Sequence, residues 1–222
     1  MKVILFGASG MVGQGVLREC LLDPGVELVV SIGRRSTGAA DGKLRVFVQP
    51  DLADLSGVED QLRGFDACFF PLGVTSAGMT EAEYRHVTYD LTVDVGTTLA
   101  RLNPELTFVY VSGAGTDSTE HGRAMWARVK GATENALLRL PIHGAYMFRP
   151  GLIRPLHGIR SKTRLYRISY TLLWPLMPLL SALLPNYITT TEKVGRAMIR
   201  VAREGSPRKI LNAREINALG TG

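Results

Sequence analysis

Short apolar runs alternate along the chain with segments of helical periodicity. The runs are nearly continuous rather than alternating, as is typical of parallel strands covered on both faces; they occupy residues 3–6, 28–32, 45–48, 67–70, 107–111 and 144–148. Helical patterns lie between them at 11–22, 55–64, 80–102 and 121–139. This alternation predicts an α/β fold, a doubly wound parallel sheet of the Rossmann type with strand order 3-2-1-4-5-6.

The regular alternation stops after Gly151. A basic stretch at 157–167 precedes an uncharged stretch at 168–191, and a helical pattern at 192–205 and a short strand at "KILN" follow. We expect one domain, 1–222, in which residues 151–191 are a substrate-side or interface elaboration. The uncharged stretch has the length of a membrane span, but its three prolines would interrupt a continuous helix, so we expect no span. Shallow contact with a membrane surface is the alternative.

Composition bears on the number of domains and on the cellular compartment. The 222 residues, 45% of them hydrophobic, suit one compact domain. Cys20 lies in a predicted helix and Cys68 in an apolar run, which indicates two buried free thiols and neither a disulfide framework nor a metal site. The start of the sequence has too short an apolar run for a signal peptide, so a reducing cytoplasm is expected. A monomer and a homodimer are both compatible with the sequence.

Charge is unevenly distributed. Residues 1–120 carry 9 basic and 16 acidic side chains, whereas residues 121–222 carry 17 basic and 4 acidic ones. Such asymmetry is compatible with an anionic ligand, a membrane surface, nucleic acid or simply a solvated basic face. No motif of a nucleic-acid-binding module is present, so a nucleic-acid partner is not expected.

A glycine motif follows the first predicted strand. "GASGMVG" places Gly7, Gly10 and Gly13 at the turn into the first predicted helix, the context that a dinucleotide site requires. The first helical residues, Met11 and Val12, would present free backbone N–H groups and the positive end of the helix dipole to phosphates. Glycines also mark ordinary turns, but this position between a strand and a helix favours a cofactor site.

The end of the second strand bears on the choice of cofactor. An NAD site usually has an acidic residue about twenty residues after the glycine motif, which bonds the ribose 2′-hydroxyl. This sequence has Arg34 and Arg35 there, which suit a 2′-phosphate, and Ser9 and Ser36 would add hydroxyl donors. We therefore expect NADP as the cofactor, with NAD as the alternative. The simplest other explanation of the two arginines is that they are merely solvated loop residues.

Two loops complete the predicted cofactor groove. Asp51 and Leu52 follow the third strand, where they would contact the adenine edge, although a loop aspartate can equally serve as a cap. Leu72, Gly73 and Val74 follow the fourth strand, where the glycine would allow close passage of a ribose or would simply form a turn.

Together these segments resemble a known family. The glycine motif, Asp51-Leu52, "PLGVT", "VYVSGAG" (109–115), "WARVKG" (126–131) and "FRPGLIRP" (148–155) are similar to those of atypical short-chain dehydrogenase/reductases. Within that family the segments most resemble the Tat-interacting-protein-like NAD(P)-binding proteins, of the NAD-dependent epimerase/dehydratase group. The resemblance implies a nicotinamide cofactor and an oxidoreductase acting on a small, partly apolar substrate.

The resemblance also implies roles for individual residues. Ser112 matches the serine that bonds a substrate oxygen, Lys130 matches the lysine that holds the nicotinamide ribose, and Arg149-Pro150 match the turn beside the nicotinamide. The catalytic tyrosine of that family would stand at position 126, which here is Trp126.

Tryptophan changes the chemistry at that position. An indole donates one N–H but does not titrate in water, so Trp126 cannot act as the acid that a phenol provides. Three alternatives follow. Another group supplies the proton, with Ser112, Tyr89, Tyr146 and a relay through Lys130, ribose and water as candidates; the reaction needs no acid; or the protein senses its cofactor without chemistry. Trp126 is also compatible with simple core packing.

Overall fold

The computed structural model describes residues 1–159 and 187–221. Seven parallel strands form one sheet, in the order β3-β2-β1-β4-β5-β6-β9. The strands are β1 (Lys2–Phe6), β2 (Leu28–Gly33), β3 (Leu44–Val48), β4 (Ala67–Phe70), β5 (Thr107–Val111), β6 (Gly144–Arg149) and β9 (Ile210–Asn212). The predicted α/β class and the order 3-2-1-4-5-6 are therefore confirmed, and the predicted strand in "KILN" extends the sheet beside β6.

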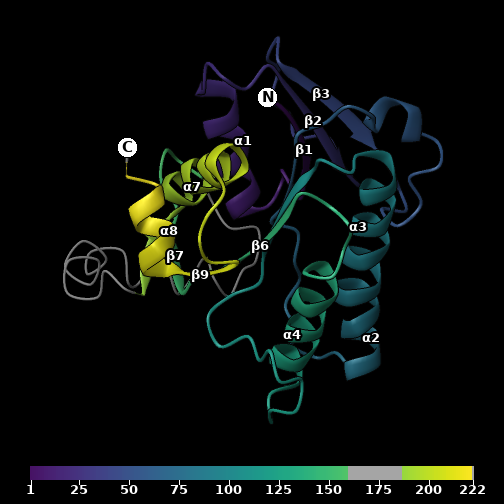
Figure 1. The fold of residues 1–222 in the computed structure, drawn as a ribbon, viewed down its shortest axis with the longest axis vertical. Helices are drawn as coiled ribbons and strands as arrows, with labels where there is room; N and C mark the ends of the chain where they lie inside the picture. The colour runs from purple at the N-terminus through teal and green to yellow at the C-terminus, as the bar shows by residue number, and fades with distance from the viewer. Residues whose placement is uncertain (160–186, 222) are drawn as a thin grey trace.

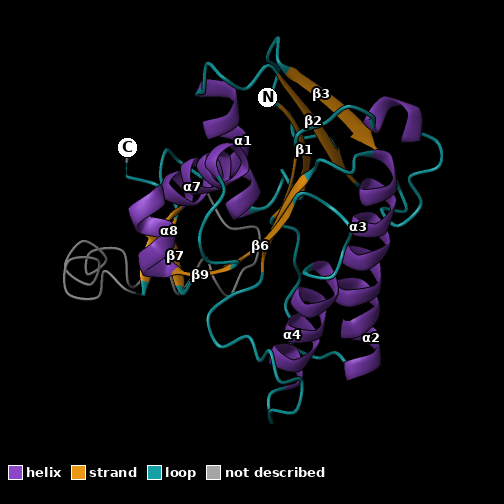
Figure 2. Cartoon of the chain, in the orientation of Figure 1, coloured by secondary structure: helices purple, strands orange, loops and turns teal. Residues whose placement is uncertain are grey.

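Helices cover both faces of this sheet (Figures 1 and 2). One layer contains α1 (Met11–Leu22), α7 (Thr191–Glu204) and α8 (Ala213–Leu219), and the other contains α2 (Glu81–Arg85), α3 (Leu91–Leu102) and α4 (Met125–Leu137). Within β1, Val3 and Leu5 pack into one core while Ile4 and Phe6 pack into the other. Burial on both faces explains why the strand sequences are continuously apolar.

The long helix predicted at 80–102 is divided. It begins with a capping box, in which Thr80 Oγ1 accepts from Glu83 N at 3.3 Å and Thr80 N donates to Glu83 Oε2 at 2.8 Å. A π-helical segment, His86–Asp90, then joins α2 to α3. The prediction of a helix at 55–64 is wrong in extent, because only the short 3-10 helix Glu59–Leu62 forms there.

The C-terminal part of the described chain adds elements that the sequence pattern did not predict. A two-stranded parallel sheet pairs β7 (Leu152–Arg154) with β8 (Ile188–Thr190). Helix α8 follows β9 and begins with a second capping box, formed by Asn212 and Glu215. Helix α7, by contrast, confirms the helix predicted at 192–205, and it packs closely on α1, where a side chain on Gly15 would collide with Thr191.

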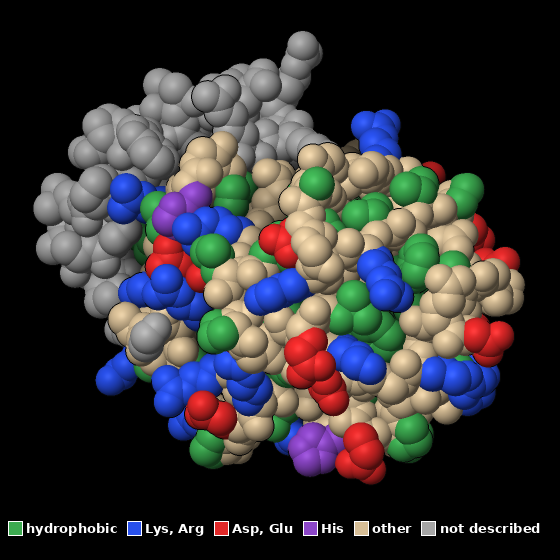
Figure 3. Space-filling view, turned by 90° about the horizontal axis from the view of Figure 1, so that it is seen from above, with side chains coloured by type: hydrophobic (Ala, Val, Ile, Leu, Met, Phe, Trp, Pro, Cys, Tyr) green, Lys and Arg blue, Asp and Glu red, His purple; other side chains and the backbone are tan. Residues whose placement is uncertain are grey.

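Ion pairs join some basic residues of the C-terminal part to acidic residues of the N-terminal part. Arg203 pairs with Asp23 and Arg196 with Glu19, and each pair joins the basic C-terminal part to the acidic N-terminal part. On the face shown in Figure 3, basic and acidic side chains lie interleaved. These pairs offset part of the charge asymmetry where α7 packs on α1.

Candidate active site

The glycine turn brings the first strand, the first helix and the end of β4 into close contact. Gly7 has a φ of +75°, which side-chain-bearing residues rarely adopt, and a Cβ there would lie 3.0 Å from the backbone of Leu72. A Cβ on Gly13 would lie 2.0 Å from the Gly7 carbonyl oxygen. Both positions therefore require glycine, one for conformation and the other for close packing of the helix on its own turn.

The amino end of α1 offers unpaired backbone donors. Gly10 is the N-cap and has no side chain to cap the helix, and the first turn contains no acidic residue. Gly10 N donates to Gly7 O at 2.9 Å, and Gln14 N makes the first helical bond to Gly10 O at 2.8 Å. The N–H groups of Met11, Val12 and Gly13 thus precede any helical acceptor, and such an end favours an anion.

A cavity of about 440 Å³ lies beside this turn. It joins the glycine turn to the end of β2, the loop after β3 and the end of β4. Two of its lining residues, Arg34 and Arg35, are exposed cations, and no acidic side chain lines it. The lining residues are Gly7, Ala8, Ser9, Ser31, Gly33, Arg34, Arg35, Thr37, Leu52 and Leu72. A single cavity is therefore lined by residues that are distant in sequence and that were predicted to form the cofactor groove, among them Gly7, Arg34 and Leu72.

Other residues predicted for the groove lie outside this lining. Asp51 Oδ1 accepts from Ala53 N at 2.9 Å, and Ser36 Oγ accepts from Gly38 N at 3.3 Å, so each side chain supports its own turn. Gly73 has open space where a side chain would stand, and Val74 is 40% exposed. Their contact with a cofactor stays a prediction.

A second cluster forms where α4 meets the ends of β5 and β6. Lys130 Nζ donates to the carbonyl oxygen of Ser112, which directly follows β5. Burial lowers the pKa of Lys130 to about 8, and the nearby carboxylate of Glu134 opposes this shift. The lysine is therefore close to its titration point at neutral pH.

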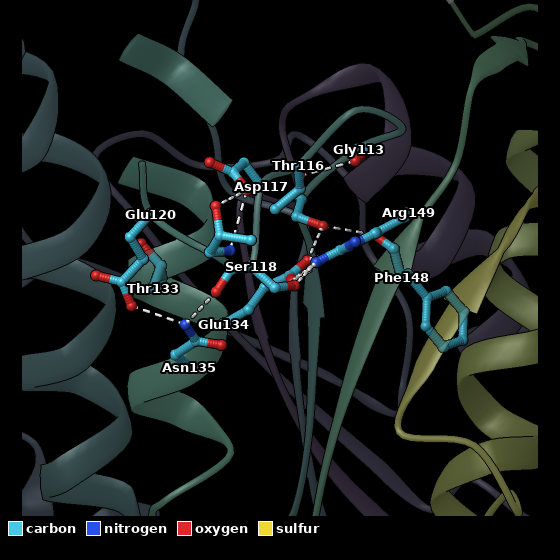
Figure 4. A network of polar contacts seen from close by, with 12 residues as sticks. Gly113, Thr116, Asp117, Ser118, Glu120, Thr133, Glu134, Asn135, Phe148 and Arg149 are labelled. Carbon is cyan, nitrogen blue, oxygen red and sulfur yellow. Dashed lines mark hydrogen bonds and ion pairs between the residues drawn. The ribbon is translucent and has the colours of Figure 1, made fainter. Parts of the chain in front are cut away.

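Glu134 is the centre of this cluster (Figure 4). Its side chain is fully buried, and its Oε1 accepts from the Ser112 hydroxyl at 2.5 Å and from Arg149 Nε at 3.0 Å. Arg149 also reaches Ser118 Oγ at 2.5 Å. Sequence reasoning missed Glu134, although its position one helical turn after Lys130 was a usable signal.

The predicted site residues at this end thus have definite partners. The Ser112 hydroxyl donates to a buried carboxylate, and the Ser112 side chain is itself buried, so its predicted role toward a substrate oxygen stays a prediction. Pro150 O accepts from Ala114 N at 2.8 Å, which places the Arg149-Pro150 turn beside the loop after β5.

Trp126 stands in the first turn of α4 and is half-buried. Its six-membered ring packs on Gly115, where a Cβ would lie 3.2 Å from Cη2. Two residues further on, Arg128 pairs with Glu81 of α2 at 2.6 Å, so the end of the loop after β4 lies beside this turn. Trp126 therefore belongs to a packed surface at the carboxyl end of the sheet.

Of the tyrosines considered as proton donors, Tyr146 has its hydroxyl engaged at another place. Its oxygen accepts from Ser206 N at 3.2 Å, just beyond the end of α7, and the Lys209 ammonium lies 4.2 Å from the ring centroid. Tyr89 lies in the π-helical segment, with the Arg85 guanidinium 3.9 Å from its ring centroid.

Three metal-ligating side chains also lie together on the opposite layer. Oxygen or nitrogen atoms of Glu19, His157 and Glu192 fall within 4.8 Å of one another. Arg18 and Arg196 bond both oxygens of Glu19, and Arg196 and His157 bond both oxygens of Glu192. Each carboxylate oxygen of this group therefore already has a partner among the described residues.

The uncharged segment predicted at 168–191 falls mostly outside the described residues. Among residues 1–159 and 187–221, no helix has both the length and the apolar character that crossing a membrane demands. The predicted substrate-side role of 151–191 therefore stays a prediction.

No protein-family model matches the sequence. The chain is 30% identical over 170 residues to the protein fmp52, mitochondrial, of Aspergillus fumigatus, covering 73% of this chain and 70% of that protein. It is 29% identical, with the same coverage, to the corresponding protein of Emericella nidulans.

Solved structures share the fold. The Bordetella bronchiseptica enzyme WbmF in complex with NAD+ superposes with a TM-score of 0.68 at 16% identity, covering 99% of this chain and 76% of that one. A short-chain dehydrogenase/reductase superfamily protein from Agrobacterium tumefaciens with bound NAD gives 0.65 at 13% identity, covering 96% and 77%. The predicted resemblance to short-chain dehydrogenase/reductases is thus confirmed for the fold.

The curated relatives also correct one expectation. Their names are those of mitochondrial proteins, which contradicts the cytoplasmic localisation predicted from the sequence. Two buried free thiols indicate only a reducing compartment and do not say which one.

The level of identity to the Aspergillus fumigatus protein, over most of both chains, shows that this chain belongs to the fmp52 family.

Proposed function

We propose that this protein binds NADP(H) and is an oxidoreductase that transfers hydride to or from a small, partly apolar substrate. One observation carries the proposal: the uncapped amino end of α1 opens beside a cavity that two arginines line. Backbone N–H groups and the helix dipole favour the pyrophosphate, and the arginines favour a further phosphate. NAD-bound structures of the same fold support a nicotinamide cofactor in this groove.

The preference for NADP over NAD rests on charge. Arg34 and Arg35 stand where an NAD site usually has a carboxylate, and the cavity lining contains no acidic residue. A 2′-phosphate would gain charge-assisted hydrogen bonds there, worth about 1.5–3 kcal/mol. Since a free ribose hydroxyl would not gain them, NADPH should bind about 10- to 100-fold more tightly than NADH.

The catalytic side of the proposal uses Lys130 and its surroundings. Lys130 would hold the nicotinamide ribose, with the Arg149-Pro150 turn beside the ring, and bound cofactor would supply the hydride. Trp126 would line the substrate side and orient a polar group through its indole N–H, without exchanging a proton. Because Lys130 titrates at about 8, it is the group beside Trp126 best suited to supply a proton through the ribose and water.

A cofactor-binding regulator without chemistry is the second candidate. The replacement of the expected tyrosine by Trp126 favours it, since this position then offers no group that titrates. On this alternative the groove would be occupied in the same way, and the protein would turn over no substrate.

Binding measurements test the proposal. NADPH and NADH dissociation constants are measured by fluorescence for the wild type and for the double variant Arg34→Ala plus Arg35→Ala. The matched control is Arg45→Ala plus Arg63→Ala, two exposed arginines outside the cavity lining. We expect the cavity variant alone to lose NADPH affinity, by 10-fold or more. Absence of binding by either nucleotide would reject the groove, and equal affinities would reject the preference for NADP.

A further inference from the structure

Glu134 is a buried charge with an unusually complete set of partners. Its side chain has 0% exposure, and both of its oxygens accept hydrogen bonds from Arg149, at 3.0 and 3.1 Å from Nε. The Ser112 hydroxyl adds a bond of 2.5 Å. A carboxylate removed from water persists only where such donors replace the water, so this arrangement fixes the geometry around it.

Glu134 and its partners join the three elements that border the proposed nicotinamide side. Glu134 lies on α4 and Arg149 ends β6 (Figure 4). Ser112 directly follows β5. Ser112 is held on several sides, because its N–H also donates to Phe148 O at 2.9 Å. Its carbonyl oxygen is the acceptor of Lys130 Nζ. The buried carboxylate is therefore linked to Lys130 through a single residue.

Glu134 also acts on Lys130 directly. The two residues are four apart on α4 and so lie on one face of the helix. The negative charge of Glu134 raises the pKa of Lys130, against the lowering by burial. From β6, Arg149 faces the same carboxylate and partly offsets its charge; from β5, Lys130 meets the uncharged Ser112 carbonyl.

We propose that Glu134 is a positioning residue for Lys130: through Ser112 and Arg149 it fixes the carbonyl that holds the lysine and the turn that borders the nicotinamide side. This inference rests on the proposed function for its link to cofactor binding, but not for its effect on Lys130. A merely structural ion pair would join α4 to the sheet without changing the titration of the lysine.

The titration of Lys130 is the readout that separates the two roles. The chain contains six lysines, so the 13Cε signals of a protein labelled at lysine can be followed individually against pH, with Lys130→Arg used for assignment. In the wild type we expect Lys130 to titrate at about 8. In Glu134→Gln we expect a lower midpoint, because the neutral amide no longer stabilises the ammonium. Glu134→Asp, which keeps the charge, should restore most of the shift.

The matched control is Glu19→Gln. Glu19 is also a buried carboxylate bonded by two arginines, but it lies on α1, in the other helical layer. It should lower the melting temperature without moving the Lys130 midpoint. An unchanged midpoint in folded Glu134→Gln, or an equal change in Glu19→Gln, would overturn the proposal. If Glu134→Gln does not fold, the Lys130 midpoint of Glu134→Asp decides: a midpoint somewhat below that of the wild type, because the shorter side chain withdraws the charge, supports the proposal, and an unchanged midpoint rejects it.

Binding of NADPH is measured on the same variants. We expect Glu134→Gln to weaken NADPH binding about 10-fold and Glu19→Gln to leave it within twofold of the wild type. If the wild type binds no nicotinamide nucleotide, the proposed function fails, whereas the Lys130 titration still decides whether Glu134 governs the lysine.

Discussion

Replacing Gly13 by alanine should damage stability and cofactor binding together. A Cβ on Gly13 would lie 2.0 Å from the Gly7 carbonyl oxygen, whereas ordinary contact begins at 3.4 Å, so helix and turn must separate by about 1.4 Å. Overpacking of this kind costs about 1–3 kcal/mol. For a chain of this length, that lowers the melting temperature by roughly 2–12 °C.

The same displacement would move the amino end of α1 away from its turn. Hydrogen bonds to a phosphate weaken steeply when the donor moves by more than 1 Å, so NADPH affinity should fall about 10- to 100-fold. Thermal unfolding and fluorescence titration measure the two effects. Gly57→Ala is the control, because a Cβ there would meet only Gln49 Nε2, at 4.0 Å. A Gly13→Ala variant that melts and binds NADPH like the wild type would refute the proposed role of the close glycine contact.

Three further predictions concern the second cluster. Trp126→Tyr should create or raise NADPH-dependent reduction in a panel of simple ketones, and adding Lys130→Ala should abolish it; unaltered activity would show that the proton comes from elsewhere. The pKa of Lys130 is 10.5 in the unfolded chain and about 8 in the folded one, so between pH 8 and pH 10.5 the unfolded chain binds more protons. The contribution of Lys130 to the free energy of unfolding therefore rises with pH across this window, by about 3 kcal/mol. The difference in the free energy of unfolding between the wild type and Lys130→Met, measured with denaturant, should change by that amount across the window. A difference that does not change with pH would argue against a lowered pKa. Gly131→Ala should lower the free energy of unfolding by about 1–3 kcal/mol, because its Cβ would lie 1.7 Å from Asp117 O. An unchanged denaturation midpoint would contradict the tight contact.

The sheet and the glycine turn could be predicted from sequence because their signals are local. The apolar runs match the strands to within about one residue at each end, and α1 has the predicted bounds of Met11–Leu22. Where polar side chains bond their own backbone, periodicity misleads. At 55–64, Asp54 Oδ1 accepts from Ser56 N at 3.0 Å, which favours a turn over the predicted helix.

The second cluster could not be predicted in the same way, because its partners are distant in sequence. Glu134 is neutralised by Arg149, 15 residues away, and hydrogen-bonded by Ser112, 22 residues away. Apolar periodicity says nothing about a buried charge, whose presence depends on partners that only the folded sheet supplies. The family resemblance predicts roles for Lys130 and position 126, whereas Glu134, one helical turn after Lys130, belongs to no motif of that resemblance.

The packing of α7 on α1 has a consequence for synthesis on the ribosome. Hydrogen bonds between these helices join residues 177 and 180 positions apart, from Arg196 to Glu19 and from Arg203 to Asp23. Helix α1 is synthesised well before α7, so the face of α1 that α7 covers stays open until α7 has left the ribosome. Val16, Leu17 and Cys20 of α1 belong to the apolar core that α7 completes, so this face is open on the nascent chain and is a place where aggregation can begin.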